Sequence, residues 1–294
     1  MAKGRGAAAA LVVVLGLVVA WAPSPSSAHV QIGAYNKTCP QAEDIVYKEM
    51  TAILGKSPEL AGPLLRLFSV DCFSKGPYIA LPTGRRDGNN SVASDVGPNS
   101  PAPGANITDL VALFAKFNLT TKDLVVLSGA HTIGKAHCSA FSGRLYNFSG
   151  ANGASDPTLD ANYTAALRGQ CKQADVATLV DLDPPTPTVF DLDYYKQVSA
   201  QRGLLATDAA LLLQDATKAY VLRQANASSP AEFFADFAES FINMSKIGVL
   251  THGHGEIRHK CSVVNPPSPT TSSATSLAGS LLLLVLLLGA ATAV

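Results

Sequence analysis

Residues 120–138 read Thr-Thr-Lys-Asp-Leu-Val-Val-Leu-Ser-Gly-Ala-His-Thr-Ile-Gly-Lys-Ala-His-Cys, and this stretch decides how the rest of the chain is interpreted. Thr120 and Asp123 have the spacing of a helix start, and the apolar run after them gives that helix a buried face. A Ser-Gly pair then ends the helix directly before His131. Taken alone, a histidine at such a boundary is either a hydrogen-bonded structural residue or a ligand, and both interpretations stay open.

Helical spacing continues on both sides of this stretch. Apolar residues recur every three or four positions in residues 110–117. Residues 229–232, Ser-Pro-Ala-Glu, have the pattern of a capping box with proline at the first helical position, and a row of phenylalanines follows in residues 233–241. We find no internal repeat and no run of alternating strands, while residues 77–103 and 150–187 are rich in Gly, Pro and Asn. The sequence therefore predicts a mainly α-helical domain with long irregular connections.

Composition excludes two broad classes of protein. The 294 residues carry 22 basic and 22 acidic side chains, and 47% of them are hydrophobic. That content is enough to form a buried core, so the chain as a whole is not disordered. The charges are dispersed, and no basic run is longer than Arg85-Arg86, so we expect no nucleic-acid partner.

The N-terminus has the pattern of a secretory signal peptide. Lys3 and Arg5 precede an apolar run at residues 7–21, and small residues lead to an expected cleavage site near Ala28. The alternative, a buried N-terminal helix, gives the basic residues no role. We therefore expect removal of residues 1–28 and secretion into a compartment that permits disulfides and glycans. Eight sequons fit a glycoprotein: Asn36, Asn89, Asn106, Asn118, Asn147, Asn162, Asn226 and Asn243.

The C-terminal residues 265–294 form a Pro/Ser/Thr linker and an apolar tail, which runs from Leu277 to Val294. This order fits a GPI-attachment signal that would leave the protein at the cell surface. A tail anchor is a second interpretation, since about 20 apolar residues span a bilayer. A removable vacuolar-type extension is a third, and the sequence leaves all three open. The folded domain is expected in residues 29–264.

The stretch around His131 resembles the proximal-histidine motif of the secreted plant (class III) haem peroxidases. Further matches follow in the same order within residues 31–264: Leu64-Leu-Arg66-Leu, Asp71-Cys72-Phe73, Gly84-Arg-Arg-Asp-Gly88, Pro101-Ala-Pro103, the segment 181–191, Leu205-Ala-Thr-Asp208 and Gly255-Glu-Ile-Arg258. The resemblance implies a two-lobed helical fold with haem b between the lobes. It also implies an oxidoreductase that oxidises small phenolic donors with hydrogen peroxide, and so takes part in peroxide removal and the response to oxidative stress.

The resemblance further implies roles for single residues. His131 would be the axial ligand of the haem iron, and Asp208 would accept its second N–H and so make the imidazole electron-rich. Arg66 would stabilise charge that develops on the peroxide. Pro101 would touch aromatic donors at the haem edge. Without the motif, a helix cap is an equally good interpretation of Asp208, and a plain turn is the better one for Pro101.

A calcium site is implied on the same side of the haem. Thr132, Asp183, Thr186 and Asp191 match proximal calcium ligands of the family, and Val189 would add its carbonyl. Calcium takes six to eight oxygen ligands, which these groups can supply. Two helix caps and a proline-rich turn are the alternative. A bound calcium would tether this loop to the segment that carries the iron ligand.

The distal side departs from the family pattern. Where the family has Arg-Leu-His-Phe-His-Asp-Cys-Phe, residues 66–73 read Arg-Leu-Phe-Ser-Val-Asp-Cys-Phe. Val70 replaces the distal histidine, and loss of such an acid/base costs roughly 10² to 10⁴ in rate. The chain runs almost directly from Phe73 to Gly76, where the family has several helices, so we expect a truncated distal lobe and feeble turnover. A catalytically inactive, peroxidase-like extracellular glycoprotein is the alternative function.

The cysteines agree with this deletion. Five are present, an odd number for a secreted chain. By the resemblance Cys138 and Cys171 form a disulfide, which would stabilise the fold by roughly 3 to 4 kcal/mol. Cys39, Cys72 and Cys261 match half-cystines whose partners lie in the missing segment, so their thiols are expected to lack family partners.

Overall fold

The computed structural model describes residues 30–57, 77, 79–90, 92–251, 253–260 and 262–266. The expected signal peptide and C-terminal apolar tail lie outside these residues, as do Arg66, Val70, Cys72 and Cys261. No helix in the described ranges is long and apolar enough to cross a membrane.

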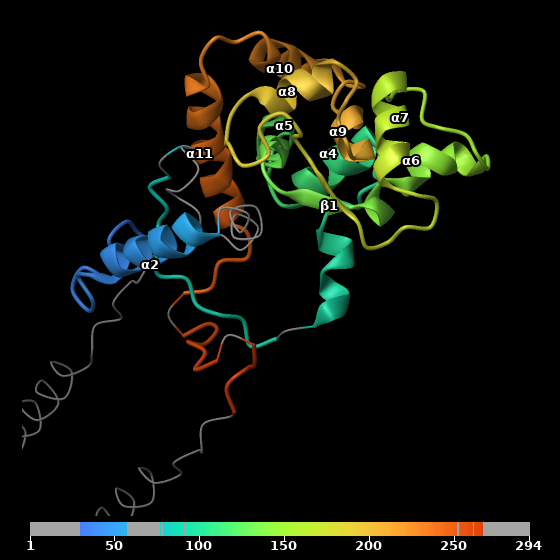
Figure 1. The fold of residues 1–294 in the computed structure, drawn as a ribbon. Helices are drawn as coiled ribbons and strands as arrows, with labels where there is room; N and C mark the ends of the chain where they lie inside the picture. The colour runs from blue at the N-terminus through green and yellow to red at the C-terminus, as the bar shows by residue number, and fades with distance from the viewer. Residues whose placement is uncertain are drawn as a thin grey trace, which may run out of the picture.

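The described chain is mainly helical, which confirms the predicted fold class (Figure 1). The α-helices are α2 (Ala42–Lys56), α4 (Ile107–Lys116), α5 (Thr121–Ser128), α6 (Ser142–Tyr146), α7 (Ala161–Gln170), α8 (Asp193–Ser199), α9 (Ala206–Ala210), α10 (Asp215–Ala225) and α11 (Ala231–Ser245). The 3-10 helices are η2 (Ala93–Asp95), η3 (Gly97–Asn99), η4 (Gly129–Thr132), η5 (Cys138–Ala140) and η6 (Phe148–Gly150). Two short strands, β1 (Lys135–His137) and β2 (Leu179–Asp181), pair antiparallel with Ala136 opposite Val180.

Helix α5 lies at the centre of the larger hydrophobic core. It packs against α4, α10 and α11, and its Leu124, Val125 and Val126 are buried. The predicted helix start is confirmed. The backbone N–H of Asp123 donates to Thr120 Oγ1 at 3.1 Å, and the N–H of Thr120 donates to Asp123 Oδ2 at 2.8 Å. This capping box fixes the beginning of the helix that leads to His131.

Helix α11 forms as predicted, with Phe233, Phe237 and Phe241 buried in the same core. The predicted capping box at 229–232 does not form. Pro230 is the N-cap instead of the first helical residue, so the Ser229 hydroxyl accepts from the N–H of Ala231. The Glu232 carboxylate pairs with Arg223 and does not cap the helix.

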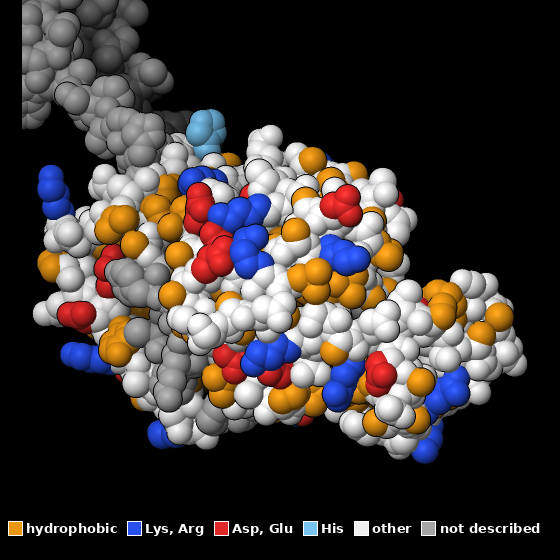
Figure 2. Space-filling view, turned by 90° about the horizontal axis from the view of Figure 1, so that it is seen from above, with side chains coloured by type: hydrophobic (Ala, Val, Ile, Leu, Met, Phe, Trp, Pro, Cys, Tyr) orange, Lys and Arg blue, Asp and Glu red, His pale blue; other side chains and the backbone are white. Residues whose placement is uncertain are grey.

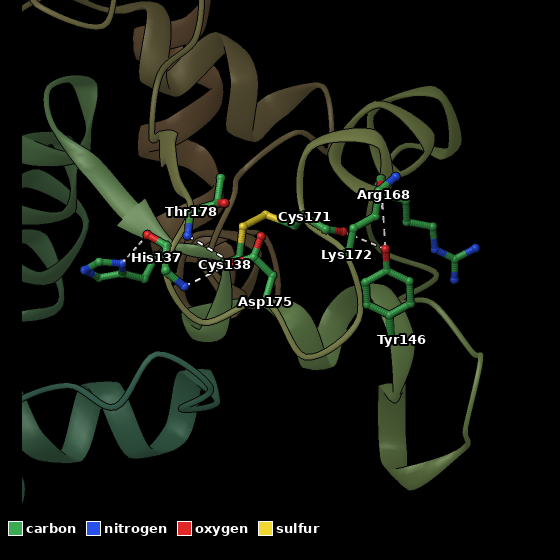
Figure 3. The surroundings of a disulfide bond; sticks show 9 residues. His137, Cys138, Tyr146, Arg168, Cys171, Lys172, Asp175 and Thr178 are labelled. Atoms are coloured by element: carbon green, nitrogen blue, oxygen red, sulfur yellow. Dashed lines mark hydrogen bonds between the residues drawn. A yellow bond between two sulfur atoms is a disulfide. The ribbon is translucent and has the colours of Figure 1, made fainter.

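A second, smaller hydrophobic cluster surrounds α6 and α7, on the side of Figure 1 opposite α2. Cys138 and Cys171 form a disulfide within it, with their Cα atoms 5.7 Å apart (Figure 3). The Tyr146 hydroxyl donates to the Cys171 carbonyl at 2.6 Å, which ties α6 to the end of α7. The predicted disulfide is thus present in the structure, while Cys39 is a free, exposed cysteine.

The surface matches the dispersed charge of the sequence. On the face seen in Figure 2, basic and acidic side chains lie among one another and no large patch of a single sign is seen. Several charged side chains of the described residues form ion pairs, such as Lys122 with Asp236 at 2.6 Å and Lys135 with Asp181 at 2.7 Å.

Candidate functional site

His131 lies in η4, which follows α5 without a break. Gly129 allows the chain to pack closely against the core at this junction. A Cβ atom at that position would lie 2.5 Å from the Tyr195 hydroxyl and 2.6 Å from the Phe233 ring. The Tyr195 hydroxyl in turn donates to the Val125 carbonyl at 3.1 Å. The end of α5 is therefore pressed against the core, and His131 projects from a fixed piece of backbone.

The imidazole of His131 is paired with a buried carboxylate. Its Nδ1 lies 2.8 Å from Asp208 Oδ1, although the two residues are 77 positions apart in the chain. The His131 side chain is 32% exposed, and that of Asp208 is 2% exposed. With Nδ1 engaged by the carboxylate, Nε2 is the ring nitrogen left to bind a metal.

Opposing effects set the charges of this pair. Burial lowers the pKa of His131, but the attraction and hydrogen bond of Asp208 outweigh it, so the pKa of His131 is raised. Burial raises the pKa of Asp208, but the charge of His131 and the hydrogen bonds that the carboxylate accepts outweigh it and lower the pKa. The carboxylate is thus held ionised next to the imidazole.

Asp208 is the third residue of α9, where its second oxygen closes the helix start. Asp208 Oδ2 accepts from the backbone N–H of Leu205 at 2.8 Å. The same side chain therefore caps a helix and orients a histidine, so both interpretations of Asp208 describe contacts that exist. Gly203 permits this approach, because a Cβ atom there would lie 2.8 Å from Asp208 Cβ.

A buried arginine holds the backbone that leads into α9. Arg144 Nη1 donates to the carbonyls of Gly203, Leu204 and Leu205 at 2.7, 2.8 and 3.0 Å. Arg144 Nε donates to Asp156 Oδ2 at 2.7 Å, and both side chains are buried. The sequence analysis missed this clamp. A buried charge in a short helix can be recognised only once the fold shows what surrounds it.

All five predicted calcium residues converge beside η4. The Thr132 hydroxyl donates to Asp183 Oδ2 at 3.0 Å and lies 3.4 Å from both Asp191 Oδ1 and the Val189 carbonyl. The Thr186 hydroxyl lies 3.4 Å from Asp183 Oδ2 and 3.3 Å from Asp191 Oδ1. The structure thus brings together, from two distant segments, five residues with oxygen atoms of the kind calcium prefers.

One carboxyl group of this oxygen cluster, that of Asp183, lies in an environment that disfavours its charge. Asp183 is fully buried, and its Oδ1 has no hydrogen-bond partner there. Burial, together with the charges of Asp193 and Asp191, raises the pKa of Asp183 to about 7 in spite of hydrogen bonds from the two threonines. No group of three or more His, Cys, Asp or Glu side chains fit to hold a metal occurs in the described ranges. The cluster has only two carboxylates, and its other oxygens come from hydroxyls and a carbonyl.

Of the remaining predicted site residues, the structure describes Pro101 and shows that it does not join this arrangement. Pro101 is exposed, between η3 and α4, and makes no hydrogen bond to His131 or Asp208 in the described structure. Arg66 lies outside the described residues. Tyr194, which the sequence analysis did not single out, donates its hydroxyl to Asp208 Oδ1 at 3.0 Å. Its only sequence signal is the Tyr194-Tyr195 pair shortly after the Asp-rich loop.

Comparison with known proteins agrees with this geometry. The family described as peroxidase matches residues 73–227. The chain is 39% identical to Peroxidase 1 of Oryza sativa subsp. japonica, in an alignment that covers 85% of this chain and 97% of the relative. It is also 37% identical to two proteins of Arabidopsis thaliana. The alignment with Peroxidase 56 covers 80% of this chain and 91% of the relative. The alignment with Peroxidase 27 covers 82% of this chain and 94% of the relative.

The alignments also bear on chain length. The alignment with the rice protein spans 317 positions, which is more than the whole of this 294-residue chain. The relative therefore has residues without a counterpart here, as an internal deletion requires.

Proposed function

Since this chain belongs to the plant haem peroxidase family, we propose that His131 is the residue that would hold the iron of haem b and that Asp208 orients it. The chain is an oxidoreductase of that family, which uses hydrogen peroxide and donor substrates. We assign it small phenolic donors, with peroxide removal and the response to oxidative stress as the setting.

The hydrogen bond between His131 and Asp208 carries this proposal. A ligating histidine almost always donates its second N–H to a carboxylate, carbonyl or water, which fixes the ring and raises its basicity. His131 has such a partner at 2.8 Å, buried and held by two further donors. Its ring is partly exposed, as is required for Nε2 to reach a cofactor. The residues present therefore fit a haem.

The residues of this chain divide the chemistry between two sides. When bound, the haem supplies the one-electron oxidation of the donor. On the proximal side, Asp208 holds the Nδ1 proton of His131 and keeps the imidazole electron-rich. On the distal side, Arg66 stabilises charge on the peroxide, while Val70 has no proton to move. Pro101 is assigned to the contact with the phenolic donor.

The test of this function is reconstitution of the secreted chain with hemin. We expect a Soret band at one hemin per chain and slow guaiacol oxidation with hydrogen peroxide, below that of a peroxidase with a distal histidine by roughly 10² to 10⁴. A Soret band without turnover would instead support the alternative function, a catalytically inactive extracellular glycoprotein. The presence of Val70 in place of the distal histidine favours that alternative. Protein that takes up no hemin would contradict the assignment of His131.

We also assign calcium to the cluster of Thr132, Asp183, Thr186, Asp191 and the Val189 carbonyl. The support is the unpartnered Asp183 Oδ1 and the raised pKa of Asp183, both of which a cation would relieve. The ion would join the loop of Asp183 to η4 next to His131. Its loss should therefore loosen the haem site as well as the fold.

Removal of calcium should lower the melting temperature of the hemin-loaded protein and speed loss of hemin to apomyoglobin. Calcium at 100 times its dissociation constant stabilises the folded state by about 2.7 kcal/mol, and a chelator abolishes this. Asp183→Asn should no longer respond to calcium or chelator. Asp175→Asn is the control and should respond as the wild type does, because Asp175 caps a turn outside the oxygen cluster. An equal response of Asp183→Asn and wild type would place calcium elsewhere.

The ends of the chain set its expected destination. We assign residues 1–28 as a removed signal peptide, residues 29–264 as the peroxidase domain and residues 265–294 as a linker and tail, with secretion or GPI attachment as the outcome. Seven of the eight sequon asparagines are exposed and open to glycosylation. The eighth, Asn243, is partly buried and donates to Asp123.

A further inference from the structure

The carboxylate of Asp208 accepts three hydrogen bonds, and two of them meet on one oxygen. Oδ1 lies 2.8 Å from His131 Nδ1 and 3.0 Å from the Tyr194 hydroxyl, while Oδ2 accepts from the Leu205 N–H. All of this occurs where Asp208 and Tyr194 are almost completely buried. Water therefore does not compete, and each donor acts strongly on the carboxylate.

The position of the Tyr194 hydroxyl is fixed by packing of its ring. The ring lies edge-on to His131, with centroids 6.0 Å apart, and edge-on to Tyr195, with centroids 5.1 Å apart. Tyr194 belongs to α8, so it approaches Asp208 from a different element than His131 does. A phenol is protonated at neutral pH and donates to an ionised carboxylate. The Tyr194 hydroxyl thus donates to the same carboxylate oxygen, Oδ1, that His131 contacts.

From this convergence we propose that Tyr194 is a positioning residue that limits how strongly Asp208 draws the Nδ1 proton of His131. The inference rests on the proposed function, in which His131 holds the haem iron. Two donors on one oxygen share its electron density, so each bond is weaker than it would be alone. Hydrogen bonds between an iron ligand and its neighbouring residues are one way in which a protein tunes the reduction potential of a haem. Tyr194 would keep the imidazole less anionic than an unshared carboxylate would.

A purely structural role makes a different prediction. Buried tyrosine hydroxyls generally form a hydrogen bond, because an unpaired buried hydroxyl is costly. If Tyr194 bonded to Asp208 only for this reason, its loss would leave the histidine unchanged. Tyr195 provides the matched control, because it follows Tyr194 on α8 and is equally buried. Its hydroxyl donates to the Val125 carbonyl, and it makes no hydrogen bond to Asp208 in the described structure.

The experiment compares Tyr194→Phe and Tyr195→Phe with the wild type, all loaded with hemin. In Tyr194→Phe the stretching frequency of the ferrous iron–histidine bond, measured by resonance Raman, should rise and the ferric/ferrous potential should fall, because Asp208 then pulls harder on the imidazole proton. Tyr195→Phe should change both values far less, because its hydroxyl donates to the Val125 carbonyl and not to Asp208. An unchanged frequency and potential in Tyr194→Phe, or equal shifts in both variants, would overturn the proposal.

A haem-free measurement separates this inference from the proposed function. In protein labelled with ¹⁵N-histidine, the Nδ1–H proton of His131 should shift downfield in Tyr194→Phe and far less in Tyr195→Phe. A chain that binds no hemin would defeat the proposed function, yet this shift would still support the sharing of Oδ1. No shift in Tyr194→Phe would overturn the sharing whether or not hemin binds.

Discussion

His131→Ala is expected to abolish stable hemin binding. The substitution removes the ligand itself, so affinity should fall by more than the roughly 10- to 100-fold that loss of an outer hydrogen-bond partner typically costs. Asp208 would keep its bonds from Tyr194 and Leu205, so the fold should survive. Absorbance titration with hemin measures the loss. Added imidazole should fill the vacated space, donate its N–H to the Asp208 carboxylate as His131 does, and restore the Soret band.

His137→Ala is the matched control. His137 lies on β1, six positions after His131, and its exposed ring contacts the Ala177 carbonyl at 3.2 Å. The variant should bind hemin as the wild type does. Equal losses in the two variants, or full hemin binding by His131→Ala without imidazole, would show that the iron ligand is a different residue.

Arg144→Met is expected to lower the free energy of unfolding by about 3 to 5 kcal/mol, because it leaves the Asp156 carboxylate buried without its cation. The carbonyls of Gly203, Leu204 and Leu205 would lose their shared donor as well. Urea unfolding followed by circular dichroism measures the change. Since these carbonyls precede α9, the hemin-loaded variant should also lose hemin faster.

Arg223→Met tests whether burial is the cause. Arg223 and Glu232 form an ion pair of similar length, 2.9 Å, but their side chains are 52% and 48% exposed, against 6% and 5% for Arg144 and Asp156. An exposed pair of this kind contributes about 0 to 1 kcal/mol, so Arg223→Met should unfold at nearly the wild-type urea concentration. Equal destabilisation by the two substitutions would contradict the buried clamp.

Much of the fold could be predicted from local signals. The start of α5 at Thr120 and Asp123, the phenylalanine face of α11 and the mainly helical character all depend on neighbours within a few positions. The capping box at Ser229 was predicted from the same kind of signal and is wrong. The helix begins one residue later than the pattern suggests, and that shift removes the geometry the box needs.

The sequence by itself determined the helical class and the motif around His131, because both depend on residue types at short spacing. Its resemblance to the family added the oxygen-rich loop near Asp183 and the Cys138–Cys171 pair. Only the tertiary structure decided that Tyr194 and His131 share Asp208 Oδ1, and that the buried Arg144 donates hydrogen bonds to three backbone carbonyls. Those contacts join segments 14 to 77 positions apart. Such contacts depend on how the helices pack and on the exclusion of water, and neither leaves a local pattern in the chain.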